Sequence, residues 1–206
     1  MRRIVDAGGP VCCEVMTNVL YGLSRLALGQ PSLTPAIVER LYDEDTGLFW
    51  PLARPALETR PPLTWSALSP LALPDLPEAI GRRLVEEHLL DPTRFWPAFP
   101  VPSVSAADPT FSVHDTVFGG IRRYWRGPTW INAAWLVWLG LVRLGYEEEA
   151  HELAQRLANL VGRSGLREYY DPFTGKGMGT VSFAWSTLAI EIAAPDPRAG
   201  SSYLEP

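Results

Sequence analysis

The sequence is constrained most by residues 129–144, a stretch with helical periodicity that is apolar on almost every side. A helix of this kind has to be buried all round. Residues 147–161 follow with a single apolar stripe and three glutamates at the start, a pattern typical of a surface helix. Residues 182–193 again leave little polar surface and are predicted to be buried. This alternation predicts two concentric rings of helices, with enclosed inner helices and half-exposed outer ones, rather than a simple four-helix bundle.

Four further helices are predicted in the first half of the chain. Residues 14–28 carry apolar side chains at helical spacing and stop at Gly29, a common C-terminal cap. Residues 77–90 place apolar side chains on one side and charged ones on the other. Shorter helices are predicted at residues 34–42, which open with Thr-Pro, and at residues 66–73. The fold class is therefore predicted to be all-α, with six or seven helices separated by proline-rich stretches.

Composition excludes several classes of protein. The 206 residues are 47% hydrophobic and 20% charged, enough for one globular domain. A net charge of −5 and 18 dispersed Lys and Arg argue against a nucleic-acid partner. The longest apolar run, residues 133–142, is about half of a membrane span, and the N-terminus lacks a secretory signal pattern, so we expect a cytoplasmic protein with no membrane partner. Because the two cysteines are adjacent and the three histidines lie far apart, no metal site is expected.

The first candidate functional segment is the loop before the most apolar helix. It places Tyr124, Trp125, Arg126 and Trp130 around a Gly-Pro pair. Aromatic rings beside a guanidinium group suit a sugar, whose faces are apolar and whose rim carries hydroxyl groups. These four residues are therefore candidate sugar-binding residues. The alternative is an aromatic cluster that only closes the core at the start of the helix. The helical tryptophans are expected to be core residues: Trp135, Trp138 and Trp185.

The second candidate segment is residues 167–172, in which a carboxylate lies among tyrosines. Glu168 in this setting is a candidate general base or one member of an acid–base pair. Two alternatives remain open: Asp171 organises the turn before a proline, and Glu168 pairs with Arg167 or Arg126. The pattern aromatic-Asp-x-x-Thr-Gly occurs at residues 170–175 and also at residues 42–47, where chance and common ancestry explain it equally well.

Four blocks together resemble glycoside hydrolase family 63. They are FWPAFPVPSV at 95–104, YWRGPTWIN at 124–132, EYYDP at 168–172 and FAWS at 183–186. Their order and spacing are most similar to the mannosylglycerate and glucosylglycerate hydrolase branch, over roughly residues 14–193. The resemblance implies an (α/α)6 barrel whose central pocket hydrolyses a small glycoside with inversion and without a cofactor.

The resemblance also implies roles for single residues. Glu168 corresponds to the family's general base, which activates water, and Tyr124, Trp125 and Trp130 correspond to residues that wall the sugar site. An inverting reaction needs a second, protonated carboxyl group about 6.5–9.5 Å from the base. In the family this general acid is an aspartate in the first half of the barrel.

The chain has no match to that acid. Its early carboxylates, Asp6 and Glu14, and the later Asp115 do not match the acid's position. We therefore interpret residues 1–206 as a single domain, the C-terminal half of the barrel, with residues 1–13 and 194–206 peripheral. An open half-ring exposes an apolar edge, which predicts a partner: a second copy or a separate N-terminal half.

Three functions remain to be distinguished. The leading one is an inverting glycosidase that acts on a small glycoside such as glucosylglycerate or mannosylglycerate, with this chain carrying the general base and inactive alone if the acid-bearing half is missing. The second is a non-catalytic sugar-binding module. The third is an all-helical interaction domain with neither activity.

Overall fold

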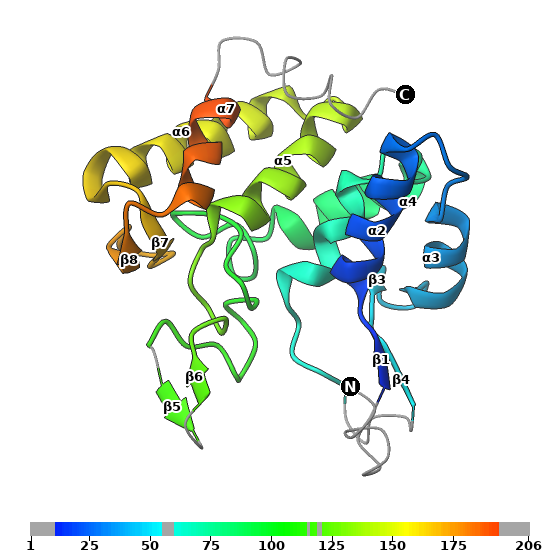
Figure 1. Cartoon of the computed structure of the whole chain (residues 1–206), viewed down its shortest axis with the longest axis horizontal. Coiled ribbons are helices and arrows are strands. Elements are labelled where there is room, and N and C mark those ends of the chain that lie inside the picture. Colours follow the sequence, from blue (N-terminus) through cyan, green and yellow to red (C-terminus); the bar gives the residue numbers. More distant parts are fainter. Residues whose placement is uncertain (1–10, 55–59, 115, 119–120, 194–206) are drawn as a thin grey trace.

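The computed structural model describes residues 11–54, 60–114, 116–118 and 121–193, in which helices alternate with short strands (Figure 1). The α-helices are α2 (Val15–Ala27), α3 (Thr34–Leu41), α4 (Glu78–Leu84), α5 (Ile131–Leu144), α6 (Glu147–Ser164) and α7 (Leu188–Ile192). Two segments are 3-10 helices and one is a π-helix: η1 (Trp65–Ala72), η3 (Ala184–Thr187) and η2 (Val85–Leu89). The strands are β1 (Val11–Cys13), β2 (Tyr42–Asp43), β3 (Leu48–Phe49), β4 (Leu52–Arg54), β5 (Thr116–Phe118), β6 (Ile121–Arg123), β7 (Arg167–Tyr170) and β8 (Gly177–Val181).

Each helix predicted from the sequence is present, but the all-α fold class needs a correction for the described part of the chain. Strands pair there as four antiparallel two-stranded ribbons, β1 with β4, β2 with β3, β5 with β6 and β7 with β8. Strands of two to five residues are too short to give the alternating pattern that identifies a strand in a sequence. The segment predicted as one helix over residues 77–90 divides into α4 and the π-helical η2.

Helix α2 begins where Glu14 caps it. The Glu14 carboxylate accepts the backbone N–H of Met16 (3.1 Å) and of Thr17 (2.7 Å). These bonds satisfy donors that every helix leaves open at its first turn. Val15 and Val19 are buried in the main core, and the helix packs on η1 and α3. Glu14 and η1 therefore fix where the N-terminal end of α2 lies.

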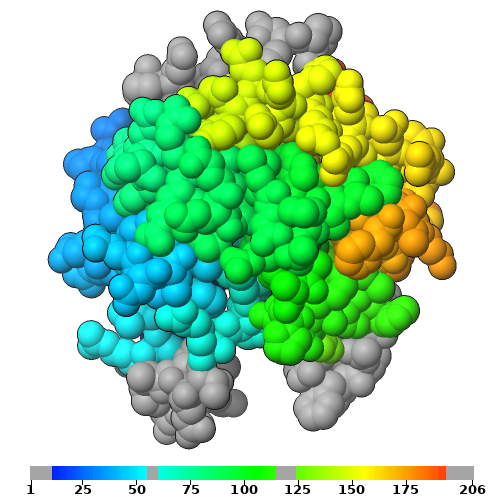
Figure 2. All heavy atoms as spheres, turned by 180° about the vertical axis from the view of Figure 1, so that it is seen from behind, coloured from blue at the N-terminus to red at the C-terminus, as the bar shows by residue number. Residues whose placement is uncertain are grey.

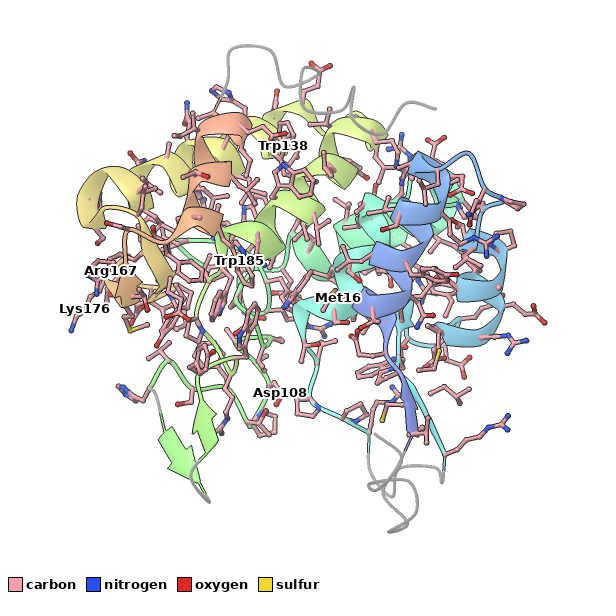
Figure 3. The ribbon with its side chains drawn as sticks, in the orientation of Figure 1. Met16, Asp108, Trp138, Arg167, Lys176 and Trp185 are labelled. Carbon is pink, nitrogen blue, oxygen red and sulfur yellow. The ribbon has the colours of Figure 1, made fainter. Side chains whose placement is uncertain are left out.

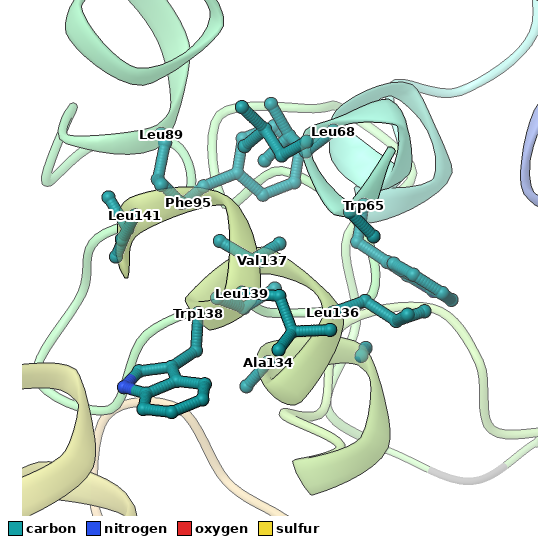
Figure 4. Packing of buried hydrophobic residues seen from close by; sticks show 14 of the residues in the cluster. Trp65, Leu68, Leu89, Phe95, Ala134, Leu136, Val137, Trp138, Leu139 and Leu141 are labelled. Carbon is teal, nitrogen blue, oxygen red and sulfur yellow. The ribbon is translucent and has the colours of Figure 1, made fainter. Parts of the chain in front are cut away.

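The core is centred on α5, which packs on η1, α6 and α7. Ala134, Val137 and Leu141 are buried on this helix against side chains of η1 and η2 (Figure 4). Helix α5 lies very close to η1 at Gly140, because a Cβ on Gly140 would lie 2.5 Å from the Cβ of Leu71 on η1. The outer helix α6 covers α5 with the single apolar stripe predicted from its sequence: Ala150, Leu153, Ala154, Leu157 and Leu160.

The helices are arranged as an arc around α5. Figure 1 shows α6 and α7 on one side of α5, with α2 and α3 on the other, while η1 connects α5 to α2 through direct packing. The opposite face is covered by the segment that joins η2 to β5, shown in green in Figure 2. The arc is thus closed behind by a long, proline-rich connection.

The two copies of the aromatic-Asp-x-x-Thr-Gly pattern form the same kind of turn. In the first copy, the Asp43 carboxylate accepts the N–H of Asp45 (3.1 Å) and the hydroxyl of Thr46 (2.9 Å). The N–H of Gly47 donates to the Asp43 carbonyl (2.8 Å), and Gly47 has a φ of +68°, which suits glycine. This turn connects β2 to β3.

The second copy forms a similar turn between β7 and β8. One carboxylate oxygen of Asp171 accepts the N–H of Phe173 and of Thr174, both at 2.9 Å. The N–H of Gly175 donates to the Asp171 carbonyl (2.9 Å), with a φ of +72° at Gly175. Asp171 therefore organises the turn, one of the two roles that the sequence left open for this segment.

The segments predicted to be peripheral are described only in part. Residues 1–10 and 194–206, with Asp6, lie outside the described residues, as does Asp115. Residues 11–13 form β1, which pairs with β4 in the register Val11 to Arg54.

Candidate functional site

The loop that carries the candidate sugar-binding residues is held from two sides. The backbone of Thr129 exchanges two hydrogen bonds with that of Tyr170 on β7, at 2.8 and 3.0 Å. The hydroxyl oxygen of Ser103 accepts the N–H of Gly127 (2.9 Å), and the Ser103 N–H donates to the Pro128 carbonyl (2.9 Å). The loop is therefore fixed to the β7–β8 ribbon and to the segment containing Ser103.

Aromatic rings from this loop and its neighbours form one cluster. The indoles of Trp125 and Trp130 are stacked with centroids 3.7 Å apart and planes 10° from parallel. Trp130 is stacked in turn against Tyr169 of β7, at 5.0 Å, and Tyr124 packs against both Trp130 and Tyr169. Trp185 of η3 lies 6.2 Å from Trp130. We call these five residues the aromatic cluster.

The exposed members of the aromatic cluster, Trp125 and Trp185, line a cavity of about 560 Å³. Figure 3 shows Trp185 on one side of it and Met16 of α2 on the other. The lining comes from the start of α2, η1, the Ser103 segment, α5 and η3: Glu14, Met16, Leu20, Thr64, Trp65, Ser66, Ser103, Trp125, Asn132, Trp135, Leu136, Trp185 and Leu188. Four indole rings with hydroxyl groups between them form a surface suited to a small sugar.

Glu168 lies beside the aromatic cluster, at the position next to Tyr169 on β7. The register of β7 with β8 shifts between Arg167 and Tyr169, because Arg167 pairs with Val181 and Tyr169 with Met178. Two residues of β8, Gly179 and Thr180, therefore lie opposite Glu168 and form a bulge on β8. A bulge interrupts the regular ladder of hydrogen bonds between two strands. Here the Glu168 carboxylate accepts the N–H of Thr180 on β8 (3.0 Å), and Glu168 is half-buried. It is not one of the residues that line the 560 Å³ cavity.

The other candidate residues occupy different positions. Trp125 faces the cavity, 36% exposed, whereas Trp130 lies behind it and is buried. Tyr124 is half-buried, and its ring packs against those of Trp130 and Tyr169. The Arg126 guanidinium group donates to the carbonyl of Thr110 (2.9 Å) and so connects its loop to the preceding segment.

Among the described residues that line the cavity, Glu14 alone carries a carboxylate. It accepts hydrogen bonds from the backbone of Met16 and Thr17 and from the hydroxyls of Thr17 and Ser66. Partial burial raises the pKa of Glu14, but these hydrogen bonds outweigh it and hold the pKa below its usual 4.5. Glu14 is therefore ionised at neutral pH and fully engaged in capping α2.

Two parts of this site were not predicted. Ser66, Ser103 and Asn132 line the cavity but were not expected as site residues, although Ser103 and Asn132 lie within two of the four family blocks. Trp185 was predicted to be a core residue, which is wrong: it is 47% exposed. The prediction that residues 182–193 are buried all round is wrong for the same reason, since Ile190 is 68% exposed, while Trp138 is buried as expected.

Within residues 11–54, 60–114, 116–118 and 121–193, no group of three or more His, Cys, Asp or Glu side chains is placed to hold a metal ion. In the same ranges, each helix is too short or too polar to pass through a lipid bilayer.

Comparison with known proteins gives one family. The model of the mannosylglycerate hydrolase MGH1-like glycoside hydrolase domain matches residues 29–186. The mannosylglycerate hydrolase of Thermus thermophilus is 30% identical over 194 residues, which cover 89% of this chain and 44% of that protein. The mannosylglycerate hydrolase of Rubrobacter radiotolerans is 47% identical over 68 residues, 33% of this chain and 15% of that protein.

Solved structures agree with the sequence comparison. The crystal structure of a glycoside hydrolase family 63 mannosylglycerate hydrolase from Thermus thermophilus in complex with glucose matches with a TM-score of 0.70 and 26% identity. The match covers 88% of this chain and 47% of that one. The fold is therefore a partial (α/α)6 toroid, and the chain spans less than half the length of these relatives.

Proposed function

Because the chain belongs to the mannosylglycerate hydrolase MGH1-like family of glycoside hydrolases, within glycoside hydrolase family 63, we propose that it supplies the general base and the aromatic wall of an inverting glycosidase. The observation that carries the proposal is the continuous stack from Trp125 in the cavity through Trp130 to Tyr169. Tyr169 is the neighbour of Glu168 on β7. The loop, the ribbon and the carboxylate therefore form one connected unit.

Glu168 has the chemistry of a base that activates water. Its Oε2 atom accepts the Thr180 N–H, so the carboxylate is oriented toward the bulge on β8. In the proposed reaction a water molecule attacks the anomeric carbon on the face opposite the leaving group, and Glu168 accepts the proton of that water. The bond from the anomeric carbon to the leaving oxygen breaks, and a general acid protonates that oxygen.

Among the described residues that line the cavity, none is suited to act as the general acid. Glu14 is unsuitable because an acid needs a raised pKa, whereas hydrogen bonds hold the pKa of Glu14 below its usual value. The acid therefore belongs to the part of the relatives that this chain does not span.

The substrate proposed is a small sugar glycoside such as mannosylglycerate or glucosylglycerate. The relatives carry the name mannosylglycerate hydrolase, and one of them holds glucose in its crystal structure. In this chain the exposed indole of Trp125 is flat, rigid and backed by Trp130, which suits stacking against the apolar face of a hexose ring.

The test is hydrolysis of mannosylglycerate and glucosylglycerate by the chain together with an acid-bearing N-terminal segment, with the anomer of the released sugar read by NMR. We expect the inverted anomer, and we expect Glu168→Gln to lower kcat by about 10²- to 10⁴-fold. Glu148→Gln, which changes an exposed carboxylate on α6, is the matched control and should leave kcat unchanged. Full activity of Glu168→Gln would refute the role of base.

One observation favours a second function, a sugar-binding module without catalysis. Glu168 is not part of the cavity lining, whereas Trp125 and Trp185 are. A module of this kind binds the sugar but does not hydrolyse it, whichever partner is present. In that case Trp125→Ala weakens sugar binding, measured by tryptophan fluorescence, while Glu168→Gln changes nothing.

A further inference from the structure

We propose that Arg167 and Gly179 are positioning residues for Glu168, because together they hold the bulge on β8 in the form that orients the carboxylate of this base. The inference rests on the proposed function and deepens it, since it concerns how the same base is held. Neither residue lines the 560 Å³ cavity. Both therefore act on the reaction through Glu168 and not by contact with the substrate.

Gly179 has a backbone conformation and surroundings that suit only a glycine. Its φ is +67°, in the left-handed region, and it is the first of the two β8 residues opposite Glu168. A bulge that begins with such a glycine is a common type in antiparallel strands. A Cβ on Gly179 would lie 2.6 Å from the Glu168 Oε2 atom and 2.7 Å from the Glu168 Cβ. The carboxylate thus occupies the space that a side chain at Gly179 would need.

The second residue of the bulge supplies the hydrogen-bond donor. The Thr180 N–H donates to the Glu168 Oε2 atom at 3.0 Å, and among the described residues it is the one donor to this carboxylate. This N–H belongs to the same planar peptide group as the Gly179 carbonyl. Whatever fixes the Gly179 carbonyl therefore also fixes the direction of the N–H.

Arg167 holds that carbonyl. Its Nη2 atom donates to the Gly179 carbonyl oxygen at 3.1 Å. In a trans peptide the C=O and N–H bonds point in opposite directions within one plane. Arg167 and Glu168 therefore hold the Gly179–Thr180 peptide from opposite sides, and the contact with Arg167 keeps the N–H directed at the carboxylate.

The guanidinium group of Arg167 is poorly satisfied for a residue that only stabilises the fold. Its Nε atom is buried and has no hydrogen-bond partner among the described residues. A buried donor without an acceptor costs free energy, so the bond to the Gly179 carbonyl is the polar contact that this group gains. Figure 3 shows Arg167 on the β7–β8 ribbon, apart from Trp185 at the cavity.

The backbone before Glu168 is fixed independently of the bulge. The Arg167 N–H donates to the Tyr170 hydroxyl oxygen (3.0 Å), and the Arg167 carbonyl accepts the Ser186 hydroxyl. The freedom that remains to the base is that of its side chain, which the Gly179–Thr180 peptide limits. A displacement of a reacting group by about 1 Å is enough to lower a rate about 10²-fold.

The first test measures amide hydrogen exchange of the whole chain by NMR and needs no activity. Glu168→Ala removes the acceptor and gives the exchange rate of the Thr180 N–H without its hydrogen bond. We expect Arg167→Met and Gly179→Ala each to raise the native rate about tenfold, toward the Glu168→Ala rate. The Tyr170 N–H, whose hydrogen bond to the neighbouring loop lies outside the bulge, should keep its rate in each variant.

Two matched controls separate the bulge from general effects of substitution. Gly29 also has a left-handed φ, +64°, but no atom lies within 4 Å of an added Cβ. Arg40 is an exposed arginine in the last turn of α3. Gly29→Ala and Arg40→Met should leave the exchange rate of the Thr180 N–H unchanged.

The second test measures kcat and KM of the chain together with the acid-bearing N-terminal segment. We expect Arg167→Met to lower kcat about 10- to 100-fold and to leave KM within about twofold, because the sugar wall is intact. An exchange rate that stays native in either variant overturns the proposal, as does faster exchange with a native kcat while Glu168→Gln is inactive. Faster exchange with full activity of Glu168→Gln supports the positioning of the carboxylate, and then the proposed function alone fails. If Gly179→Ala does not fold, Arg167→Met decides by itself.

Discussion

The Ser103 hydroxyl group holds the loop on which the proposed sugar wall depends. Ser103 is 1% exposed, and its oxygen accepts the N–H of Gly127, a buried bond of 2.9 Å. The loop is also confined on its other side, because Gly127 packs closely against the backbone of Ser112. A Cβ on Gly127 would lie only 2.7 Å from the Ser112 carbonyl oxygen. Trp125 is two residues before Gly127, so the same bond orients its indole toward the cavity.

We expect Ser103→Ala to lower the free energy of unfolding by about 1–3 kcal/mol, since it leaves a buried backbone N–H without an acceptor. Urea unfolding followed by circular dichroism measures the change. Ser24→Ala is the control, because the Ser24 hydroxyl donates to the Leu20 carbonyl on the exposed side of α2. Equal effects of the two substitutions would show that the bond to Gly127 contributes nothing.

At this scale the sequence predicts side-chain chemistry better than side-chain position. Trp125 and Trp130 were expected at a sugar site because they lie beside Arg126 in the loop before the most apolar helix, and the structure places Trp125 at a cavity. Trp185 was misplaced because residues 182–193 have the apolar sequence of an enclosed element, whereas the indole of Trp185 is 47% exposed at the cavity. The sequence did not indicate that Glu14 lines the cavity, since a glutamate that caps a helix cannot be told in a sequence from one that lines a cavity.

The packing of α5 on η1 depends on one glycine. A Cβ on Gly140 would lie 2.5 Å from the Leu71 Cβ and 2.7 Å from the Leu71 carbonyl oxygen. Because Leu71 is fully buried and part of that contact is backbone, the neighbour cannot give way cheaply. The two elements must separate if any side chain is placed there.

We therefore expect Gly140→Ala to destabilise the chain by about 1–3 kcal/mol through overpacking, despite the higher helix propensity of alanine. Gly162→Ala is the matched control on α6, where no atom lies within 4 Å of the added Cβ, and it should stabilise by about 0.5–1 kcal/mol. Thermal unfolding measures whether each substitution raises or lowers the stability. Stabilisation by Gly140→Ala would mean that α5 and η1 are less close than described.

The elements that could be predicted are those with long periodic patterns. Helices α2, α5 and α6 have 13 to 18 residues and a clear apolar period, so their limits agree with the prediction within a few residues. The ribbons could not be found because β2 and β3 have two residues each and are specified by the Asp43 turn rather than by strand composition. The bulge on β8 opposite Glu168 could not be predicted either, since it arises from the pairing of β7 with β8.

At the scale of the whole molecule, the arc brings distant segments together through buried polar groups as well as through the core. His88 on η2 is 5% exposed. Its Nε2 lies 3.0 Å from the carbonyl of Thr46 in the β2–β3 turn, and its Nδ1 lies 3.1 Å from the Arg94 guanidinium group. This arrangement needs the neutral ring, with Nε2–H donating to Thr46 and Nδ1 accepting from Arg94.

Burial, together with the positive charge of Arg94, lowers the pKa of His88 below its ordinary 6.5, although Thr46 and Glu87 act in the opposite direction. Between the folded and the unfolded pKa, the unfolded chain binds the extra proton, so stability is complete above about pH 6.5 and is lost as the pH falls toward the folded pKa. Carboxylates with lowered pKa values, such as Asp91 and Asp108, act in the same direction, but from the usual aspartate value of 3.8 downward. The contribution of His88 to the pH dependence of stability is therefore lost at a higher pH than the contributions of Asp91 and Asp108.

We expect the free energy of unfolding to fall between pH 7 and pH 5 with a slope of at most about 1.4 kcal/mol per pH unit, the limit for one proton. His88→Gln, which keeps a donor and an acceptor without a titrating ring, should flatten this slope. His114→Gln, at an exposed position, should leave it unchanged. Urea titrations at closely spaced pH values measure the three slopes. If His88→Gln keeps the native slope, the pH dependence comes from another group, and the contact between η2 and the β2–β3 turn does not depend on a neutral imidazole.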